Sequence, residues 1–124
     1  MKVSIGSKIV NGPWGGGNLF VKNLSNFLLS NGHEVIYDLG DKDIDLILLT
    51  DPRSRKESSS TFNHQDIQSY KKYISRNVAV VQRINECDER KNTNKVNKKM
   101  LHVSNNSDYT VFVSYWIRDL YWKL

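Results

Sequence analysis

The feature that most constrains the fold is a glycine-rich turn that leads directly into an amphipathic helix. Three consecutive glycines, Gly15 to Gly17, precede the segment Asn18 to Asn31, whose apolar residues recur at helical spacing. Segments typical of β-strands lie on both sides, Lys2 to Val10 before the glycines and Glu34 to Leu39 after the helix. A strand, a turn, a helix and a second strand form a βαβ unit, the building block of a parallel sheet.

The glycine turn also predicts a binding site for an anion. Glycine has no β-carbon, so the backbone can adopt positive φ and a ligand can approach the amides closely. The first turn of a helix has N–H groups without intrahelical partners, and the helix dipole favours negative charge there. Gly15, Gly16, Gly17 and Asn18 are therefore candidates to bind a phosphate or pyrophosphate. The alternative is that the turn is only a flexible hinge.

Comparison with known phosphate loops narrows the kind of anion site. No lysine followed by Ser or Thr comes after the glycines, so the turn is not a P-loop. The GxGxxG spacing of a dinucleotide-binding turn is also missing. Trp14 precedes the glycines, and it can either stack on a ligand ring or cover the start of the helix. Both roles remain open.

The rest of the chain continues the alternation of strands and helices. Ligands of such sheets bind at the C-terminal ends of the strands, so the glycine turn, Asp51 to Arg55, Gln82 to Asp88 and Ser114 are expected to form one rim. At 124 residues we expect one domain, residues 1–124, with a Rossmann-like three-layer α/β fold and a mainly parallel five-stranded sheet. The further strands are expected at Ile44–Thr50, Asn77–Ile84 and Asp108–Val113, and the further helices at His64–Ser75, Thr93–Asn105 and Tyr115–Leu124.

A dense polar cluster follows the fourth expected strand. Arg83 can bind a carboxylate or phosphate through two parallel hydrogen bonds. Gln82 can form hydrogen bonds, and Asn85, Glu86 and Asp88 can accept hydrogen bonds from sugar hydroxyls. The cluster therefore predicts binding of a polar ligand. The alternative is a solvent-exposed turn whose charges pair with one another.

The net charge of +5 is unevenly distributed along the chain. A positive field from the basic residues between Arg90 and Lys99 suits an anionic membrane surface, a phosphorylated ligand or nucleic acid, whereas the alternative is a solvated helix face. No apolar run approaches the roughly 18 to 20 residues of a membrane span, and the first residues lack the features of a signal peptide. We expect a cytoplasmic protein, with peripheral contact at a membrane surface as a further expectation.

Several kinds of reactive centre are not indicated. His33, His64 and His102 show no metal-ligand spacing with one another or with Cys87, so no metal is expected. The single cysteine excludes an internal disulfide, and no base accompanies it as in a catalytic thiol. The segment Tyr115 to Leu124 is unusually apolar for a terminal helix, which indicates either packing against further sequence or an interface.

Three stretches together resemble a known enzyme family. The first is Gly15-Gly16, followed by Phe20 and by a helix that ends in the sequence GHEV at Gly32 to Val35. The second is Arg83 to Thr93, and the third is Asp108 to Trp116. In this order they resemble the N-terminal domain of family 4 (group 1) glycosyltransferases of the GT-B fold.

The resemblance implies a retaining enzyme that transfers a sugar from a nucleotide-sugar donor to a sugar, lipid or polysaccharide acceptor. Its active site would lie in a cleft between two Rossmann-like domains, of which this chain is the acceptor-side half. Gly15, Gly16 and Gly17 would contact the donor diphosphate, without a metal cofactor. Many relatives have a histidine after the fourth strand where this chain has Gln82 and Arg83, so the catalytic residue stays unassigned.

The resemblance also implies a C-terminal domain with the nucleotide site, in the same chain or in a separate one. The 124 residues alone are then expected to be inactive, and the donor sugar and acceptor stay open. The alternative function is that of a non-catalytic α/β module that binds a phosphorylated ligand or nucleic acid. No RNA-binding aromatic signature accompanies the lysines, which weighs against nucleic acid.

Overall fold

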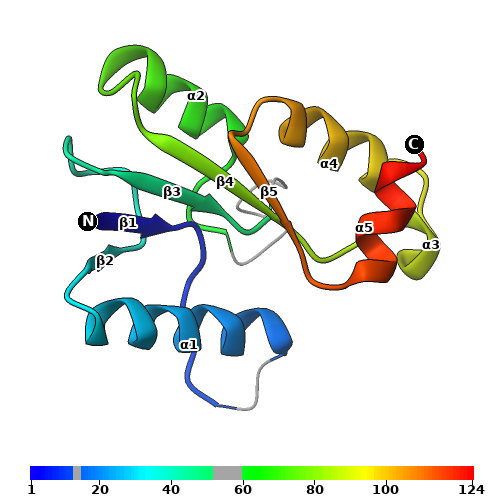
Figure 1. Cartoon of the computed structure of the whole chain (residues 1–124), viewed down its shortest axis with the longest axis horizontal. Helices are drawn as coiled ribbons and strands as arrows, with labels where there is room; N and C mark the ends of the chain where they lie inside the picture. The colour runs from blue at the N-terminus through cyan, green and yellow to red at the C-terminus, as the bar shows by residue number, and fades with distance from the viewer. Residues whose placement is uncertain (13–14, 52–59) are drawn as a thin grey trace.

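Five parallel strands form the centre of the computed structural model, in the order β2-β1-β3-β4-β5 (Figure 1). The structure describes residues 1–12, 15–51 and 60–124, so Trp14 and residues 52–55 of the expected rim lie outside the described residues. The strands are β1 (Lys2–Ile5), β2 (Glu34–Ile36), β3 (Leu46–Leu49), β4 (Ala79–Ile84) and β5 (Tyr109–Phe112).

Helices cover both faces of the sheet. Helix α1 (Gly16–Ser30) lies on one face, and α2 (His64–Tyr73) and α4 (Val96–Asn105) lie on the other (Figure 1). The short α3 (Asp88–Lys91) and the last helix, α5 (Tyr115–Trp122), lie at one end of the molecule beside α4. This arrangement confirms the expected Rossmann-like three-layer α/β fold.

The hydrophobic core is divided between the two faces because successive side chains of a strand point to opposite sides. In β3, Ile47 and Leu49 join the cluster that includes Ile67 of α2, whereas Leu48 joins the cluster that includes Val21 of α1. A strand covered on both faces is apolar along its whole length, which explains the sequence LILL.

Local signals set the ends of two helices. Asn63 and Asp66 form a reciprocal capping box at the start of α2, with N···O distances of 2.9 and 3.0 Å. Beyond the C-terminal end of α1, Gly32 adopts a left-handed φ of 81°. The glycine there follows the helix as the sequence predicts.

Several element bounds differ from the sequence expectations, above all the end of β1 and the start of α4. Strand β1 ends at Ile5 rather than Val10, because the Ser7 N–H turns back to the Ile5 carbonyl (2.8 Å) and the chain leaves the sheet. Helix α4 begins at Val96 rather than Thr93, and the unpredicted α3 precedes it. Strand β1 lies between β2 and β3, so the connection over residues 37–45 crosses an intervening strand without a helix.

Candidate functional site

The strand order creates a topological switch point at the carboxyl ends of β1 and β3. The chain leaves β1 toward α1 on one face, and it leaves β3 toward α2 on the opposite face. In open α/β sheets ligands bind where neighbouring strands diverge in this way. The glycine turn begins α1 at this edge, so it occupies the position that the fold favours for a ligand.

The backbone of the three glycines differs in one respect from the sequence expectation. Gly15 is extended (φ −60°, ψ −179°), and Gly16 and Gly17 are the first residues of α1. The described glycines with positive φ are Gly12 and Gly32, so the prediction that Gly15–Gly17 use positive φ is wrong. A β-carbon on any of the three would have no atom within 4 Å. Among the residues that the structure describes, none covers the N-terminal amides of α1 or requires glycine there by packing.

Arg83 supplies a positive charge close to this helix terminus. The side chain is on the α1 face of β4, with its guanidinium carbon 4.2 Å from the centroid of the Phe20 ring, a cation–π contact. Arg83 is 9% exposed. In the described part of the chain it forms no hydrogen bond or ion pair. Burial lowers the pKa of Arg83, yet a guanidinium remains charged at neutral pH.

The contact with Phe20 brings two separately predicted features together. Phe20 lies four residues after Gly16, which is about 6 Å along the helix axis. The Phe20 contact therefore places the Arg83 guanidinium against the N-terminal half of α1, the helix that Gly16 and Gly17 begin. A buried cation without a counter-ion is unfavourable, so an anion that reaches both groups of donors would be bound favourably.

Two lysines add positive charge at the same edge of the sheet. Lys91 and Lys99 line a hollow of about 110 Å³ together with Asp51, Glu86 and Met100. The Lys91 Nζ lies 3.9 Å from a Glu86 carboxylate oxygen, and both lysines are exposed. In the sequence these lysines are only part of a basic stretch. The sequence shows their spacing along the chain, but it does not show their position at the edge of the sheet, because that position depends on where α3 and α4 pack.

Asn18 has a structural role in its side chain. Its Oδ1 accepts a hydrogen bond from the Val10 N–H (2.8 Å), and its Nδ2 donates to the Val10 carbonyl (2.7 Å). This pair of bonds fixes the segment that follows β1 against the start of α1. The Asn18 side chain is therefore occupied, and only its neighbours Gly16 and Gly17 present free groups to a ligand.

Gln82 does not reach the rim. It is 0% exposed and lies on the α4 face of β4, where its Nε2 donates to the Met100 Sδ (3.5 Å). Its Oε1 has no hydrogen-bond partner among the residues that the structure describes. Adjacent strand residues point to opposite faces, so Gln82 and Arg83 cannot both face α1.

Asp88 fixes the start of α4. Its carboxylate accepts hydrogen bonds from the Thr93 hydroxyl (2.6 Å) and from the N–H groups of Val96 (2.9 Å) and Asn97 (3.0 Å). Burial opposes the charged form, but these hydrogen bonds prevail and hold the pKa of Asp88 below its usual range. The carboxylate thus acts as a cap for α4.

The other predicted residues lie at the carboxyl edge with mixed roles. Ser114 caps the start of α5, since its Oγ accepts a hydrogen bond from the Ile117 N–H (3.2 Å). The carbonyl of Asn85 accepts from Arg90 Nη1 (3.3 Å), and that of Glu86 accepts from the Tyr121 hydroxyl (2.8 Å). The half-buried side chains of Asn85 and Glu86 follow β4 directly, so they remain candidates to contact a ligand at the rim.

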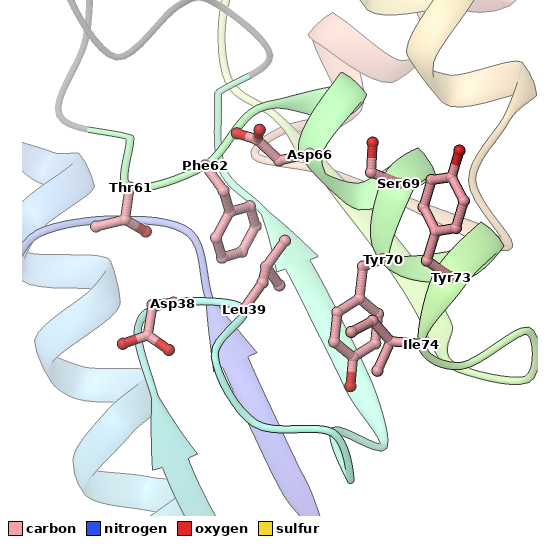
Figure 2. A pocket seen from close by; sticks show the side chains of 9 residues that line it. All are labelled: Asp38, Leu39, Thr61, Phe62, Asp66, Ser69, Tyr70, Tyr73 and Ile74. Atoms are coloured by element: carbon pink, nitrogen blue, oxygen red, sulfur yellow. The ribbon is translucent and has the colours of Figure 1, made fainter.

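A separate hollow of about 440 Å³ lies between α2 and the segment after β2 (Figure 2). Its polar side chains stabilise the fold: Asp66 belongs to the α2 capping box, the Tyr70 hydroxyl donates to the Asp41 carbonyl (2.8 Å), and Asp38 accepts from the Gly40 N–H (2.9 Å). Two carboxylates in its lining disfavour a phosphate. This hollow is therefore a poor site for an anion such as pyrophosphate.

Comparisons of the chain with protein-family models, with curated proteins and with solved structures find no match. Among the residues that the structure describes, no three His, Cys, Asp or Glu side chains are grouped so that they could hold a metal ion. The buried Arg83 guanidinium, which packs on Phe20 of α1, is the cationic group that we consider further as a ligand contact.

Proposed function

We propose that the chain is the acceptor-side N-terminal domain of a retaining glycosyltransferase of the GT-B fold, similar to family 4. The observation that carries this proposal is the buried Arg83 guanidinium, which contacts Phe20 in the N-terminal half of α1 and forms no hydrogen bond or ion pair in the described part of the chain. The three resembling stretches also fall on elements that meet at one edge: the start of α1, the segment after β4, and β5 with its exit into α5.

In this proposal the carboxyl edge of the sheet stabilises the diphosphate that leaves the donor sugar. When the bond between the sugar and the donor diphosphate breaks, negative charge grows on the departing oxygen. The N–H groups of Gly16 and Gly17 and the Arg83 guanidinium are fixed donors that would stabilise this charge more strongly in the transition state than in the ground state. Asn85 and Glu86 are placed to accept hydrogen bonds from sugar hydroxyls.

The proposal divides the work between two domains. The nucleoside part of the donor would bind to a second Rossmann-like domain, in the same chain or in a separate one. This chain alone would bind the diphosphate weakly and would not transfer sugar. Donor binding, rather than turnover, is therefore the appropriate measurement on the 124 residues.

An NMR titration of the isotopically labelled chain with pyrophosphate and a panel of nucleotide-sugars tests the proposal. We expect the amide signals of Gly16 and Gly17 to shift. The substitution Arg83→Gln should weaken binding about 10- to 100-fold, because a charge-assisted hydrogen bond contributes roughly 1.5 to 3 kcal/mol. Arg83→Lys, which keeps the charge but loses the planar fork, should fall between. Arg76→Gln, which removes an exposed arginine, should leave binding unchanged.

Two outcomes would count against a transferase. Nucleotide-sugars that bind no more tightly than inorganic sulfate would mean that the edge selects charge alone. Preferential binding of a single-stranded oligonucleotide, with a steep loss of affinity as salt rises, would favour the non-catalytic alternative. The amide spectrum of each variant shows whether it retains the native fold.

A further inference from the structure

Helix α5 exposes large apolar side chains on its outer surface. Its inner residues Ile117 and Tyr121 pack in a core cluster with Met100 of α4. Outward, Trp122 is 84% exposed and Trp116 is 55% exposed. A further two residues of this segment are also mostly exposed, Tyr115 and Leu124. Such a concentration of exposed apolar surface marks an interaction site more often than isolated exposed residues do.

Exposed basic residues lie beside this helix. The side chains are on α3, on α4 and on the segment between them, at the same end of the molecule as α5 (Figure 1). The Tyr121 hydroxyl ties the elements together, since it donates to the Glu86 carbonyl (2.8 Å) and contacts the Asn97 Oδ1 (3.1 Å). We call this surface the aromatic-basic end, which comprises Arg90, Lys91, Lys95, Lys98, Lys99, Tyr115, Trp116, Trp122 and Leu124.

The acidic groups nearby are largely engaged within the fold. Asp88 caps α4, and Glu89 accepts from the Asn97 Nδ2 (3.1 Å). Asp119 pairs with its neighbour Arg118 (2.9 Å). By contrast, Lys95 and Lys98 form no ion pair in the part of the chain that the structure describes. The five basic side chains of the aromatic-basic end outnumber the nearby acids Glu86, Asp88 and Glu89, so this end carries an excess of positive charge.

We propose that the aromatic-basic end docks on the surface of an anionic lipid bilayer. Tryptophan and tyrosine rings favour the headgroup level of a membrane, and Leu124 would enter the acyl boundary. The lysines would be attracted to anionic headgroups. The contact is peripheral, at the headgroup level; no described helix is long and apolar enough to cross a membrane. The inference does not depend on the proposed transferase function.

The chemistry of the patch favours a bilayer over nucleic acid. A single-stranded nucleic acid also combines lysines with aromatic rings, on which its bases stack. Leu124 has no ring for a base to stack on, and neither does Val113, which is exposed just before α5. Such side chains gain from leaving water for an apolar phase, and a bilayer provides that phase next to the charged headgroups.

Vesicle co-sedimentation of the full chain tests the proposal. Vesicles of phosphatidylglycerol mixed with phosphatidylcholine should bind the protein, and vesicles of phosphatidylcholine alone should bind it at least about 10-fold more weakly. Tryptophan emission provides a second readout in a Trp14→Phe background, in which only Trp116 and Trp122 remain. We expect a blue shift of this emission when anionic vesicles are added, because the rings leave water.

Two variants separate the charged and apolar contributions. The double substitution Lys95→Gln/Lys98→Gln should weaken vesicle binding about 30-fold, at roughly five-fold for each lysine at an anionic surface. Trp116→Ser/Trp122→Ser should weaken it at least as strongly. The matched controls are Lys71→Gln/Lys72→Gln on α2 and Phe27→Ser on α1, which remove charge and exposed apolar surface elsewhere. Both controls should bind like the wild type.

Several results would overturn the inference. These are absence of binding to anionic vesicles, equal loss in the control and test variants, or an emission maximum that vesicles do not move. Tighter binding of a single-stranded oligonucleotide than of vesicles would assign the surface to nucleic acid instead. A dimer that dissociates only in Trp116→Ser/Trp122→Ser would assign it to a second copy of the chain. Because donor binding by Arg83 is measured separately, either proposal can fail alone.

Discussion

Among single residues, Asp88 is a polar residue near the carboxyl edge of the sheet that stabilises the fold by capping α4. The substitution Asp88→Asn removes the charge that three donors stabilise. At neutral pH we expect the melting temperature to fall by about 3 to 8 °C, as for loss of a helix cap. Asp119→Asn is the matched control, because Asp119 is exposed and contacts only the adjacent Arg118 in the described structure. It should change the melting temperature by less than about 1 °C.

The pH dependence of the same variant tests the assigned cause. The pKa of Asp88 is lower in the folded state than the ordinary aspartate value of 3.8. The stabilisation is therefore complete above that value and is lost as pH falls through the folded-state pKa. Thermal unfolding followed by circular dichroism should show the wild type and Asp88→Asn converging between about pH 5 and pH 2. A constant difference over this range would mean that the ionised carboxylate is not the stabilising group.

The opposite placement of Gln82 and Arg83 could have been predicted from strand alternation alone. Val80, Gln82 and Ile84 share one face of β4, so only one of the two polar residues can face α1. Which face holds which helix, and the contact of Arg83 with Phe20, could not be predicted. That contact joins residues 63 positions apart in sequence, and it depends on how α1 packs on the sheet.

In helix α1, the glycines lower the stability of the helix but favour the binding of an anion. Gly16→Ala and Gly17→Ala should each raise the free energy of unfolding by up to about 1 kcal/mol, because alanine favours a helix and the added methyl group meets no atom within 4 Å. The same methyl groups cover the amides, so pyrophosphate binding should weaken about five-fold or more. Chemical denaturation and the NMR titration measure the two effects.

Asn23→Ala provides the control for this prediction, since Asn23 is an exposed residue in the middle of α1. It should raise helix stability without any effect on binding. If the glycine variants behave like Asn23→Ala in both measurements, the turn does not bind the anion. The hinge interpretation of the sequence would then be preferred.

Apart from the short α3, which was not predicted, the existence of the elements was easier to predict than their ends. Helix α1 has a regular apolar spacing and a glycine after its end, and both signals are local. Just after β1, Gly6 packs against a residue that is distant in sequence: a β-carbon on Gly6 would lie 2.7 Å from the Phe62 ring. The position of β1 between β2 and β3 is also set at long range, since Ser4 Oγ donates to the Asp38 carbonyl (2.6 Å).

Over the whole molecule, charged side chains form different groups at the two edges of the sheet. At the amino ends of the strands Lys2 is surrounded by Asp41 and Asp43, each 2.8 Å from its Nζ, and by Glu34 at 3.6 Å. These acids raise the pKa of Lys2, with the hydrogen bond from Lys2 to Asp41 as the largest cause. The opposite edge holds Arg83, Lys91 and Lys99. The hollow that Lys91 and Lys99 line also holds the carboxylates of Asp51 and Glu86, so the attraction of this edge for an anion comes from the basic side chains nearest the bound ligand.

This distribution predicts two different salt dependences for one anion. Lys91 and Lys99 are exposed, so they act on pyrophosphate through a field that salt screens. Lys91→Gln/Lys99→Gln should weaken binding about three- to ten-fold at roughly 20 mM NaCl and hardly at all at about 0.5 M NaCl. Arg83 is buried where it contacts Phe20, so the loss caused by Arg83→Gln should persist at both salt concentrations.

Calorimetric titration at the two salt concentrations measures pyrophosphate binding by the wild type, by Lys91→Gln/Lys99→Gln and by Arg83→Gln. Lys71→Gln/Lys72→Gln is the charge-matched control. If the Arg83→Gln deficit disappears at high salt, Arg83 acts at long range, and the contact site at the N-terminus of α1 is wrong.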